Sequence, residues 1–181
     1  MSIYRLKKLL KSQYTINPIE IKKLWGYENS NYLVITDNNK YVFKTYIYEE
    51  DLLSIIEAEN GALLYLQKNN EGSYPQPIVF NDGSYVKVLE IDGEKIICRL
   101  VSFVEGELLG FTTPTKALFQ SLGRFISKLD LQLQPFNNNA IKARQWQWDI
   151  QYLNLNKKYS HLDNIPIYFI FLKFRRENEI C

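Results

Sequence analysis

Tyr41-Val42-Phe43-Lys44 is an aromatic, strand-like run that ends in a lysine. The run continues through Tyr46 to Tyr48, and Lys44 is the only charged residue inside it. An isolated lysine on a strand ordinarily protects an exposed sheet edge from pairing with another chain. A different explanation requires a carboxylate that packing could bring to the same place.

Glu59 is that carboxylate. Residues 50–69 have apolar side chains at helical spacing, which predicts a helix that follows the strand of Lys44. Glu59 falls in the middle of the apolar stripe, where an unpaired charge costs several kcal/mol. Either the glutamate reaches solvent, or it pairs with a cation. The strand–helix order favours a buried Lys44–Glu59 ion pair. The stripe consists of Leu52, Ile55, Ile56, Ala62, Leu63 and Leu66.

A lysine on the third strand and a glutamate on the next helix are typical of kinase-type nucleotide sites. There the lysine neutralises the α- and β-phosphates, and the glutamate fixes the position of the lysine. We therefore expect Lys44 and Glu59 to bind a nucleotide.

The remaining pattern predicts an α+β fold, with about five antiparallel strands and one helix inserted after the third strand. Turn residues at 37–40 and at Asp92-Gly93 predict two hairpins. A helix should start at Thr113-Pro114, with the threonine as N-cap. No element is assigned after residue 164. Strands are expected at 19–27, 31–36, 41–48, 78–80, 85–91 and 95–103, and further helices at 3–10 and 145–157.

Two further segments fit a nucleotide site. The polar turn at 28–31 lies where a kinase-like fold covers the phosphates, so Asn29, Ser30 and Asn31 are candidate phosphate ligands, assisted by backbone amides. An ordinary hairpin would have the same composition. The turn is preceded by a single glycine, Gly26.

The run at 96–106 passes from a buried strand into a glycine-broken linker, as the hinge of a two-lobed kinase does. Backbone groups of Ser102 and Val104 would then bind the purine. Val101, Ile35 and Val42 would supply apolar contact. The alternative is simply a strand that leaves a sheet.

Composition excludes several classes of protein. There are 22 basic and 20 acidic residues, and the resulting net charge of +2 gives no electrostatic footprint for nucleic acid. The longest apolar run, at 165–174, is about half of the ~20 residues that a membrane-spanning helix needs. Two cysteines and no signal peptide favour the cytoplasm.

The order of these pieces resembles the aminoglycoside phosphotransferase-like kinases, and within them the hydroxylysine kinase branch. The resemblance covers about residues 19–150, and the spacing of Arg144, Trp148 and Asp149 favours that branch. It is carried by ENSNYLV, KYVFK, EAENGALLYL, YPQP, CRLVSFVEGE, LFQSLGRFISKLD, LQPF and ARQWQWDI.

The resemblance implies a protein-kinase-like N-terminal lobe over 1–104 and an incomplete helical C-terminal lobe over 105–181. It also implies ATP or GTP with Mg²⁺, and transfer of the γ-phosphoryl group to a small hydroxylated or amino compound such as 5-hydroxylysine.

The chain departs from the family at the catalytic loop, which reads roughly HGDxxxxN. His161-Leu162-Asp163 has part of the spacing, but Tyr168 stands where the loop needs asparagine. We therefore expect a truncated, N-terminal part with no catalytic or metal-binding residues, and no useful phosphate transfer by this chain alone.

The rival interpretation is a non-enzymatic remnant or partner-binding module whose exposed apolar surface favours self-association. A third, a nucleic-acid binder that stacks bases on its aromatic strands, fits poorly with the balanced charge.

Overall fold

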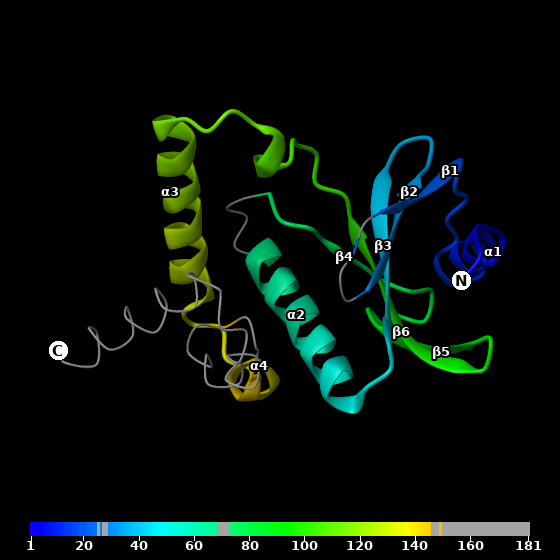
Figure 1. The fold of residues 1–181 in the computed structure, drawn as a ribbon. Coiled ribbons are helices and arrows are strands. Elements are labelled where there is room, and N and C mark those ends of the chain that lie inside the picture. Colours follow the sequence, from blue (N-terminus) through cyan, green and yellow to red (C-terminus); the bar gives the residue numbers. More distant parts are fainter. Residues whose placement is uncertain (25, 27–28, 69–72, 146–148, 150–181) are drawn as a thin grey trace, which may run out of the picture. The chain divides into compact units, whose positions relative to one another are not determined.

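The computed structural model describes residues 1–24, 26, 29–68, 73–145 and 149. The chain divides into two compact units, Met1–Lys142 and Ala143–Cys181, and the fold below is that of the first unit. Its centre is a six-stranded antiparallel sheet (Figure 1). The strands are β1 (Glu20–Leu24), β2 (Ser30–Ile35), β3 (Lys40–Ile47), β4 (Pro77–Ile78), β5 (Lys87–Ile91) and β6 (Glu94–Ser102).

The sheet has the order β1-β2-β3-β6-β4, and β5 also pairs with β6. The β5–β6 connection confirms the predicted hairpin, because Asp92 and Gly93 both have positive φ values, of 58° and 81°. Such values at both central residues are typical of a tight two-residue turn. One helix, α2 (Glu50–Lys68), lies between β3 and β4 in the chain. The expected α+β architecture is therefore confirmed.

Helix α1 (Ile3–Tyr14) packs on one face of the sheet. It begins at the N-cap Ser2, whose hydroxyl accepts a hydrogen bond from the Arg5 amide at 3.3 Å. Leu6 and Leu10, one helical turn apart, are fully buried against the strands. The helix extends one turn beyond the predicted 3–10, because Tyr14 also packs into this core. It ends at Thr15, which adopts the left-handed conformation.

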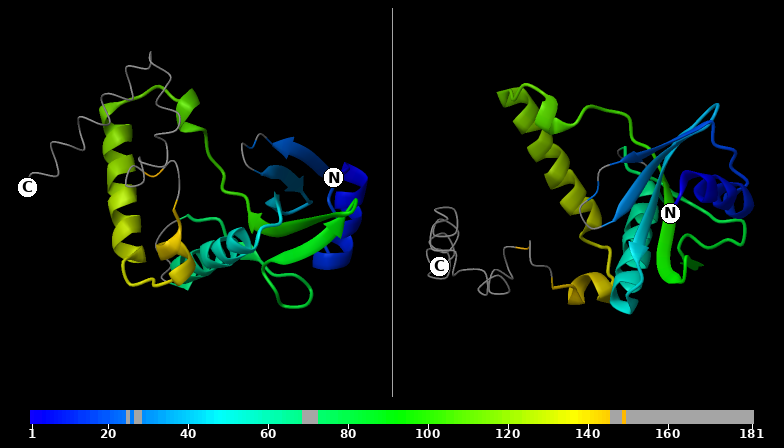
Figure 2. Two further views of the ribbon diagram at one scale, coloured as in Figure 1. Left: turned by 60° about the horizontal axis from the view of Figure 1, so that its bottom comes forward. Right: turned by 45° about the vertical axis from the view of Figure 1, so that its right-hand side comes forward.

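Helix α2 covers the opposite face, as two further views make clear (Figure 2). Ile56 is buried there against Tyr46 of β3 and Ile97 of β6. Each strand residue faces either α1 or α2, because side chains alternate along a strand. This alternation decides which predicted residues can form a site together.

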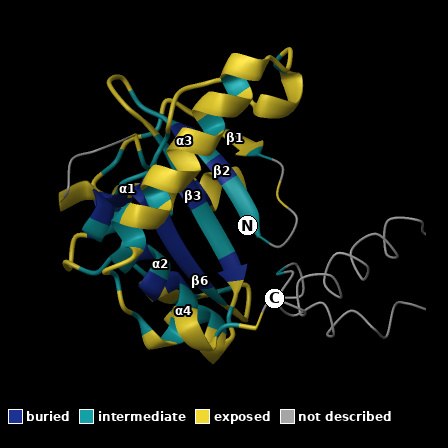
Figure 3. Ribbon diagram, turned by 90° about the vertical axis from the view of Figure 1, so that its left-hand side faces the viewer, coloured by how far each residue is buried: buried dark blue, intermediate teal, exposed yellow. Residues whose placement is uncertain are grey.

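Three helical segments follow the sheet: η1 (Leu109–Phe111), α3 (Lys116–Leu133) and α4 (Asn139–Ala143). Helix α3 has no buried residue, and it appears in the intermediate and exposed colours in Figure 3. Its contacts within the unit include a hydrogen bond of 2.8 Å from the Tyr74 hydroxyl to Gln132.

The predicted start of α3 was wrong by two residues. Thr115, and not Thr113, is the N-cap, because its hydroxyl accepts the Leu118 amide at 3.1 Å. Helix α4 begins at Asn139, and the side-chain oxygen of Asn138 accepts a hydrogen bond from the Ala140 amide at 2.9 Å. The expected helix at 145–157 lies almost entirely outside the described residues, as does His161.

None of the helices in the part of the chain that the structure describes is long and apolar enough to cross a membrane. The division into lobes at residue 104 stays a prediction.

Replacing Leu10 by alanine should lower the free energy of unfolding by about 2–5 kcal/mol, because it opens a cavity in the core beneath α1. Chemical denaturation would measure the loss. Lys11→Ala, at the exposed neighbouring position, should change stability by less than about 0.5 kcal/mol. Equal effects of the two substitutions would show that α1 does not pack as described.

Candidate functional site

Asn31, Lys44 and Arg99 form one row across β2, β3 and β6. Asn31 is the register partner of Lys44, and Lys44 is the register partner of Arg99. Directly paired residues in antiparallel strands project to the same face of the sheet. Here that face is the one which α2 covers. The side chains of Lys44 and Arg99, both cations, therefore lie side by side on the face of the sheet that α2 covers.

Glu59 of α2 pairs with Arg99, not with Lys44 as the sequence predicted. An Nη2 atom of Arg99 lies 2.7 Å from the Glu59 Oε2 atom. The ion pairs within the described part of the chain do not include Lys44. Glu59 does pair with a cation from the sheet, but its side chain is 39% exposed, so the predicted buried carboxylate is wrong. The cation comes from β6, because the β3–β6 register places Arg99 beside Lys44.

Arg99 makes two further hydrogen bonds from its buried position, where it is only 5% exposed. It donates to the side-chain oxygen of Asn60 at 2.9 Å and to the hydroxyl of Tyr46 at 3.1 Å. Asn60, itself buried, donates to the Tyr85 carbonyl at 3.3 Å. Burial raises the pKa of Tyr46, and the neighbouring guanidinium of Arg99 opposes that shift. This network joins α2 to β3 and β6.

Lys44 is half-buried, and its pKa lies below the ordinary 10.5 of a lysine. Burial is the largest cause, the positive charge of Arg99 acts in the same direction, and the carboxylate of Glu59 opposes both. The charged form of Lys44 therefore has a higher free energy in the folded protein than in water. An anion bound beside Lys44 would lower the free energy of this charged form.

Three predicted apolar contacts lie on the same face as Lys44. Val42 is the register partner of Val101, one pleat along from the Lys44–Arg99 pair. Ile35 follows on β2 with the side-chain parity of Asn31. The structure therefore brings together Asn31, Ile35, Val42, Lys44 and Val101.

The end of β6 offers a purine fewer groups than the sequence suggested. The Ser102 amide donates to the Gln76 carbonyl at 2.8 Å, and the Ser102 hydroxyl accepts the Gln76 amide at 2.8 Å. Phe103 donates to the carbonyl of Lys40. Val104 is 41% exposed, and its amide enters no backbone–backbone bond among the described residues. Val104 is thus the more accessible of the two predicted hinge residues.

The polar turn before β2 is closely packed around Gly26. A Cβ atom at Gly26 would lie 2.3 Å from the Asn29 carbonyl oxygen and 2.7 Å from the Asn31 amide nitrogen. Only glycine allows this approach. Ser30 pairs with Thr45, so it projects to the face opposite Lys44. Of the three predicted polar ligands, Asn31 is the one whose side chain shares the face of Lys44.

The described residues do not supply a Mg²⁺ site. Within them, no group of three or more His, Cys, Asp or Glu side chains could hold a metal ion. Cys98 is buried, and burial raises the pKa of its thiol to about 12, so it is no nucleophile at neutral pH.

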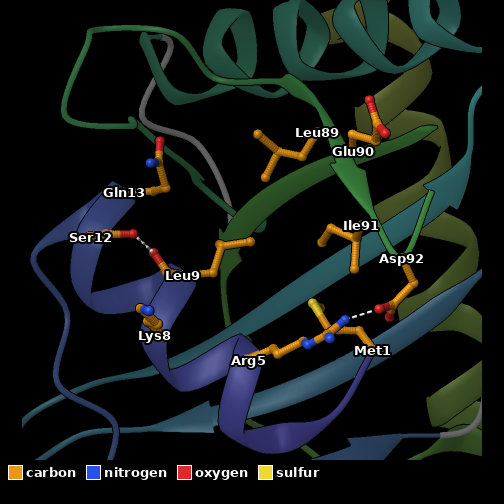
Figure 4. A pocket seen from close by; sticks show the side chains of 10 residues that line it. All are labelled: Met1, Arg5, Lys8, Leu9, Ser12, Gln13, Leu89, Glu90, Ile91 and Asp92. Atoms are coloured by element: carbon orange, nitrogen blue, oxygen red, sulfur yellow. Dashed lines mark hydrogen bonds and ion pairs between the residues drawn. The ribbon is translucent and has the colours of Figure 1, made fainter. Parts of the chain in front are cut away.

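A separate cavity of about 440 Å³ lies between α1 and the β5–β6 hairpin (Figure 4). Arg5 of the helix and Asp92 of the hairpin turn form an ion pair there. Because these two charges neutralise each other, they provide no unbalanced charge for a ligand. The cavity is on the α1 side of the sheet, away from Lys44.

Comparison with protein families matches residues 20–164 to the phosphotransferase enzyme family. This is most of the chain, and it includes the row of Asn31, Lys44 and Arg99. The chain belongs to the phosphotransferase enzyme family. No curated protein matches it.

Solved structures of small-molecule kinases share the fold of this phosphotransferase-family chain. An amicoumacin kinase in complex with AMP-PNP, Ca²⁺ and amicoumacin is 17% identical, with a TM-score of 0.63 over 92% of this chain and 48% of the other. A microcompartment-associated aminopropanol kinase is 19% identical, with a TM-score of 0.63 over 83% and 46%. A spectinomycin phosphotransferase with ADP and spectinomycin is 16% identical, with a TM-score of 0.60 over 99% and 54%.

These likenesses confirm the predicted kinase-like N-lobe fold, and the family match over residues 20–164 confirms the predicted wider family. The chain spans about half the length of these solved relatives.

Asn60→Ala should destabilise the protein by about 1–3 kcal/mol, because an N–H of Arg99 and the carbonyl of Tyr85 lose their partner in a buried place. Urea denaturation would measure this. Glu57→Ala, at an exposed position of the same helix, is the matched control. A loss no greater than that of the control would contradict the network.

Proposed function

We propose that this chain is the nucleotide-binding part of a small-molecule kinase of the hydroxylysine kinase branch. The observation that carries the proposal is the row of two cations, Lys44 and Arg99, beside the single carboxylate of Glu59. Like charges directly opposite each other destabilise a sheet. Binding of the phosphates of ATP or GTP would offset the repulsion between Lys44 and Arg99.

The other predicted residues have matching roles in this proposal. Val42, Val101 and Ile35 contact the base, and the amide of Val104 donates to it. Asn31 and the backbone amides of Asn29 and Ser30 bind phosphate oxygens. Residues 1–104 would form the nucleotide-binding lobe. The family's catalytic aspartate and metal ligands are not among the residues that we assign.

The proposed reaction of the complete enzyme breaks the bond between the γ-phosphorus and its bridging oxygen to the β-phosphate. A bond forms from the γ-phosphorus to the hydroxyl oxygen of the acceptor, and the hydroxyl proton is released. A small hydroxylated amine such as 5-hydroxylysine is the proposed acceptor. The proposed location is the cytoplasm, where the buried thiol of Cys98 stays reduced.

Lys44→Met should weaken the binding of ATP or GTP by roughly 10- to 100-fold, because a charge-assisted contact worth about 1.5–3 kcal/mol is lost. Isothermal titration calorimetry with each nucleotide, with and without Mg²⁺, measures this. Lys23→Met, at an exposed position of β1, is the control. Failure of the unchanged protein to bind either nucleotide would refute the proposal. Equal weakening by the control would refute the role of Lys44.

Gly26→Ala should also weaken nucleotide binding. The added methyl group requires the Asn29 carbonyl to move, and a turn displaced in this way costs about 1–3 kcal/mol. Gly123→Ala is the control, because a Cβ atom at this position of α3 meets nothing within 4 Å. If calorimetry gives the same affinity for Gly26→Ala and the unchanged protein, the turn around Gly26 does not take part in nucleotide binding.

A second candidate function is self-association through the apolar side chains of η1 and α3. Phe111 is 88% exposed, and Leu108, Phe119 and Leu131 are more than half exposed. Apolar patches of this kind are typical of interaction surfaces. Sedimentation velocity over a range of concentrations tests this. A monomer at all concentrations would exclude it, and Phe111→Ser with Phe119→Ser should weaken any association that is found.

A further inference from the structure

We propose that Arg99 is a positioning residue that binds Glu59 in place of Lys44, so that Lys44 is kept as the cation for the nucleotide phosphates. This inference rests on the proposed function and deepens it. It separates two tasks that one lysine–glutamate pair would otherwise combine. Arg99 anchors the helix, and Lys44 meets the ligand.

The anchoring task follows from the contacts of Arg99. Its guanidinium reaches α2 at Glu59 and Asn60, and it reaches β3 at the Tyr46 hydroxyl. A planar guanidinium has five N–H donors in a rigid fork that spans several partners, whereas the three donors of a lysine ammonium all radiate from one nitrogen. Because Arg99 is buried, these partners are what make its charge tolerable. The carboxylate of Glu59 is therefore an ion-pair partner of Arg99.

The ligand-binding task falls to Lys44. The charged groups that act on it are Arg99 from β6 and Glu59 from α2, and the titratable Tyr46 of its own strand lies on the same face of the sheet. Arg99 repels its ammonium, and Glu59 already has a partner at 2.7 Å. Lys44 is thus a half-buried cation without an ion pair within the described part of the chain. A polyphosphate is the class of ligand that would supply the missing charge, with Arg99 adding a second positive charge behind Lys44.

This arrangement has a consequence that a Lys44–Glu59 pair would not have. Without ligand, the charge of Lys44 opposes folding, so its removal should stabilise the protein. If Lys44 were the ion-pair partner of Glu59, removal of the lysine would leave the carboxylate without its cation and destabilise the protein.

The decisive experiment is thermal unfolding of the ligand-free 181-residue chain carrying Lys44→Met. We expect a higher melting temperature than that of the unchanged protein, by more than the change caused by Lys23→Met. Adding Glu59→Gln to Lys44→Met should give additive shifts. A melting temperature that falls, or a strongly non-additive double variant, would overturn the inference.

Arg99→Lys supplies the complementary result. This substitution keeps the positive charge but removes the planar guanidinium that contacts Glu59, Asn60 and Tyr46. Glu59→Gln should therefore shift the melting temperature less in the Arg99→Lys background than in the unchanged protein. Equal shifts in the two backgrounds would contradict the anchoring role.

The stabilisation by Lys44→Met should also depend on pH. A lysine whose folded pKa is lowered binds fewer protons in the folded state than in the unfolded state, so stability rises with pH between the folded pKa and 10.5. The advantage of Lys44→Met should therefore shrink as pH rises through that range. A constant difference between pH 7 and pH 10.5 would argue against it.

The last measurement is thermal unfolding in the presence of nucleotide. At the same concentration, ATP or GTP should raise the melting temperature of the unchanged chain more than that of Lys44→Met. If neither nucleotide acts on the unchanged chain, the proposed function fails. The ligand-free experiments would still decide whether Arg99 or Lys44 holds Glu59.

Discussion

The ion pair between Arg99 and Glu59 is the constraint on which the site depends. A guanidinium buried in a sheet is costly unless its donors find acceptors, and α2 provides two acceptors for the Nη atoms of Arg99 in Glu59 and Asn60. Apolar packing alone could let the helix slide along the sheet, because such contacts are not directional. The polar contacts have fixed directions, so they set where the helix lies relative to β3 and β6. The position of every residue near Lys44 follows from this.

The two faces of the sheet are used differently, and alternation along the strands keeps the uses apart. On the α1 face, Phe43 and Leu100 pair across β3 and β6 and are fully buried. One residue further along, Lys44 and Arg99 pair on the α2 face. The same two strands therefore contribute a hydrophobic core on one side and a positively charged row on the other. A register shift of one residue would destroy both at once.

Local features of the fold could be predicted from the sequence, and long-range partners could not. The Asp92-Gly93 turn and the helix after β3 are determined by short stretches, so they were predicted closely. The partner of Glu59 lies forty residues away and depends on the β3–β6 register. Arg99 showed the same anomaly as Lys44, a charge within a buried strand, and this signal could have identified it. The strand–helix order favoured Lys44 instead, because that lysine is nearer to Glu59 in the sequence.

Lys44 also shows how a stable fold can keep a group that opposes its own folding. A core chosen only for stability would place an apolar side chain there, as it does at Phe43. Arg99 adds to this cost, because its positive charge lies beside Lys44, and the carboxylate of Glu59, which pairs with Arg99, offsets the cost only in part. The remaining cost has a use if an anion binds, since the same charge that weakens the empty fold strengthens the complex. Strain of this electrostatic kind is more informative about function than the well-paired surface ions are, because surface pairs contribute little in either state.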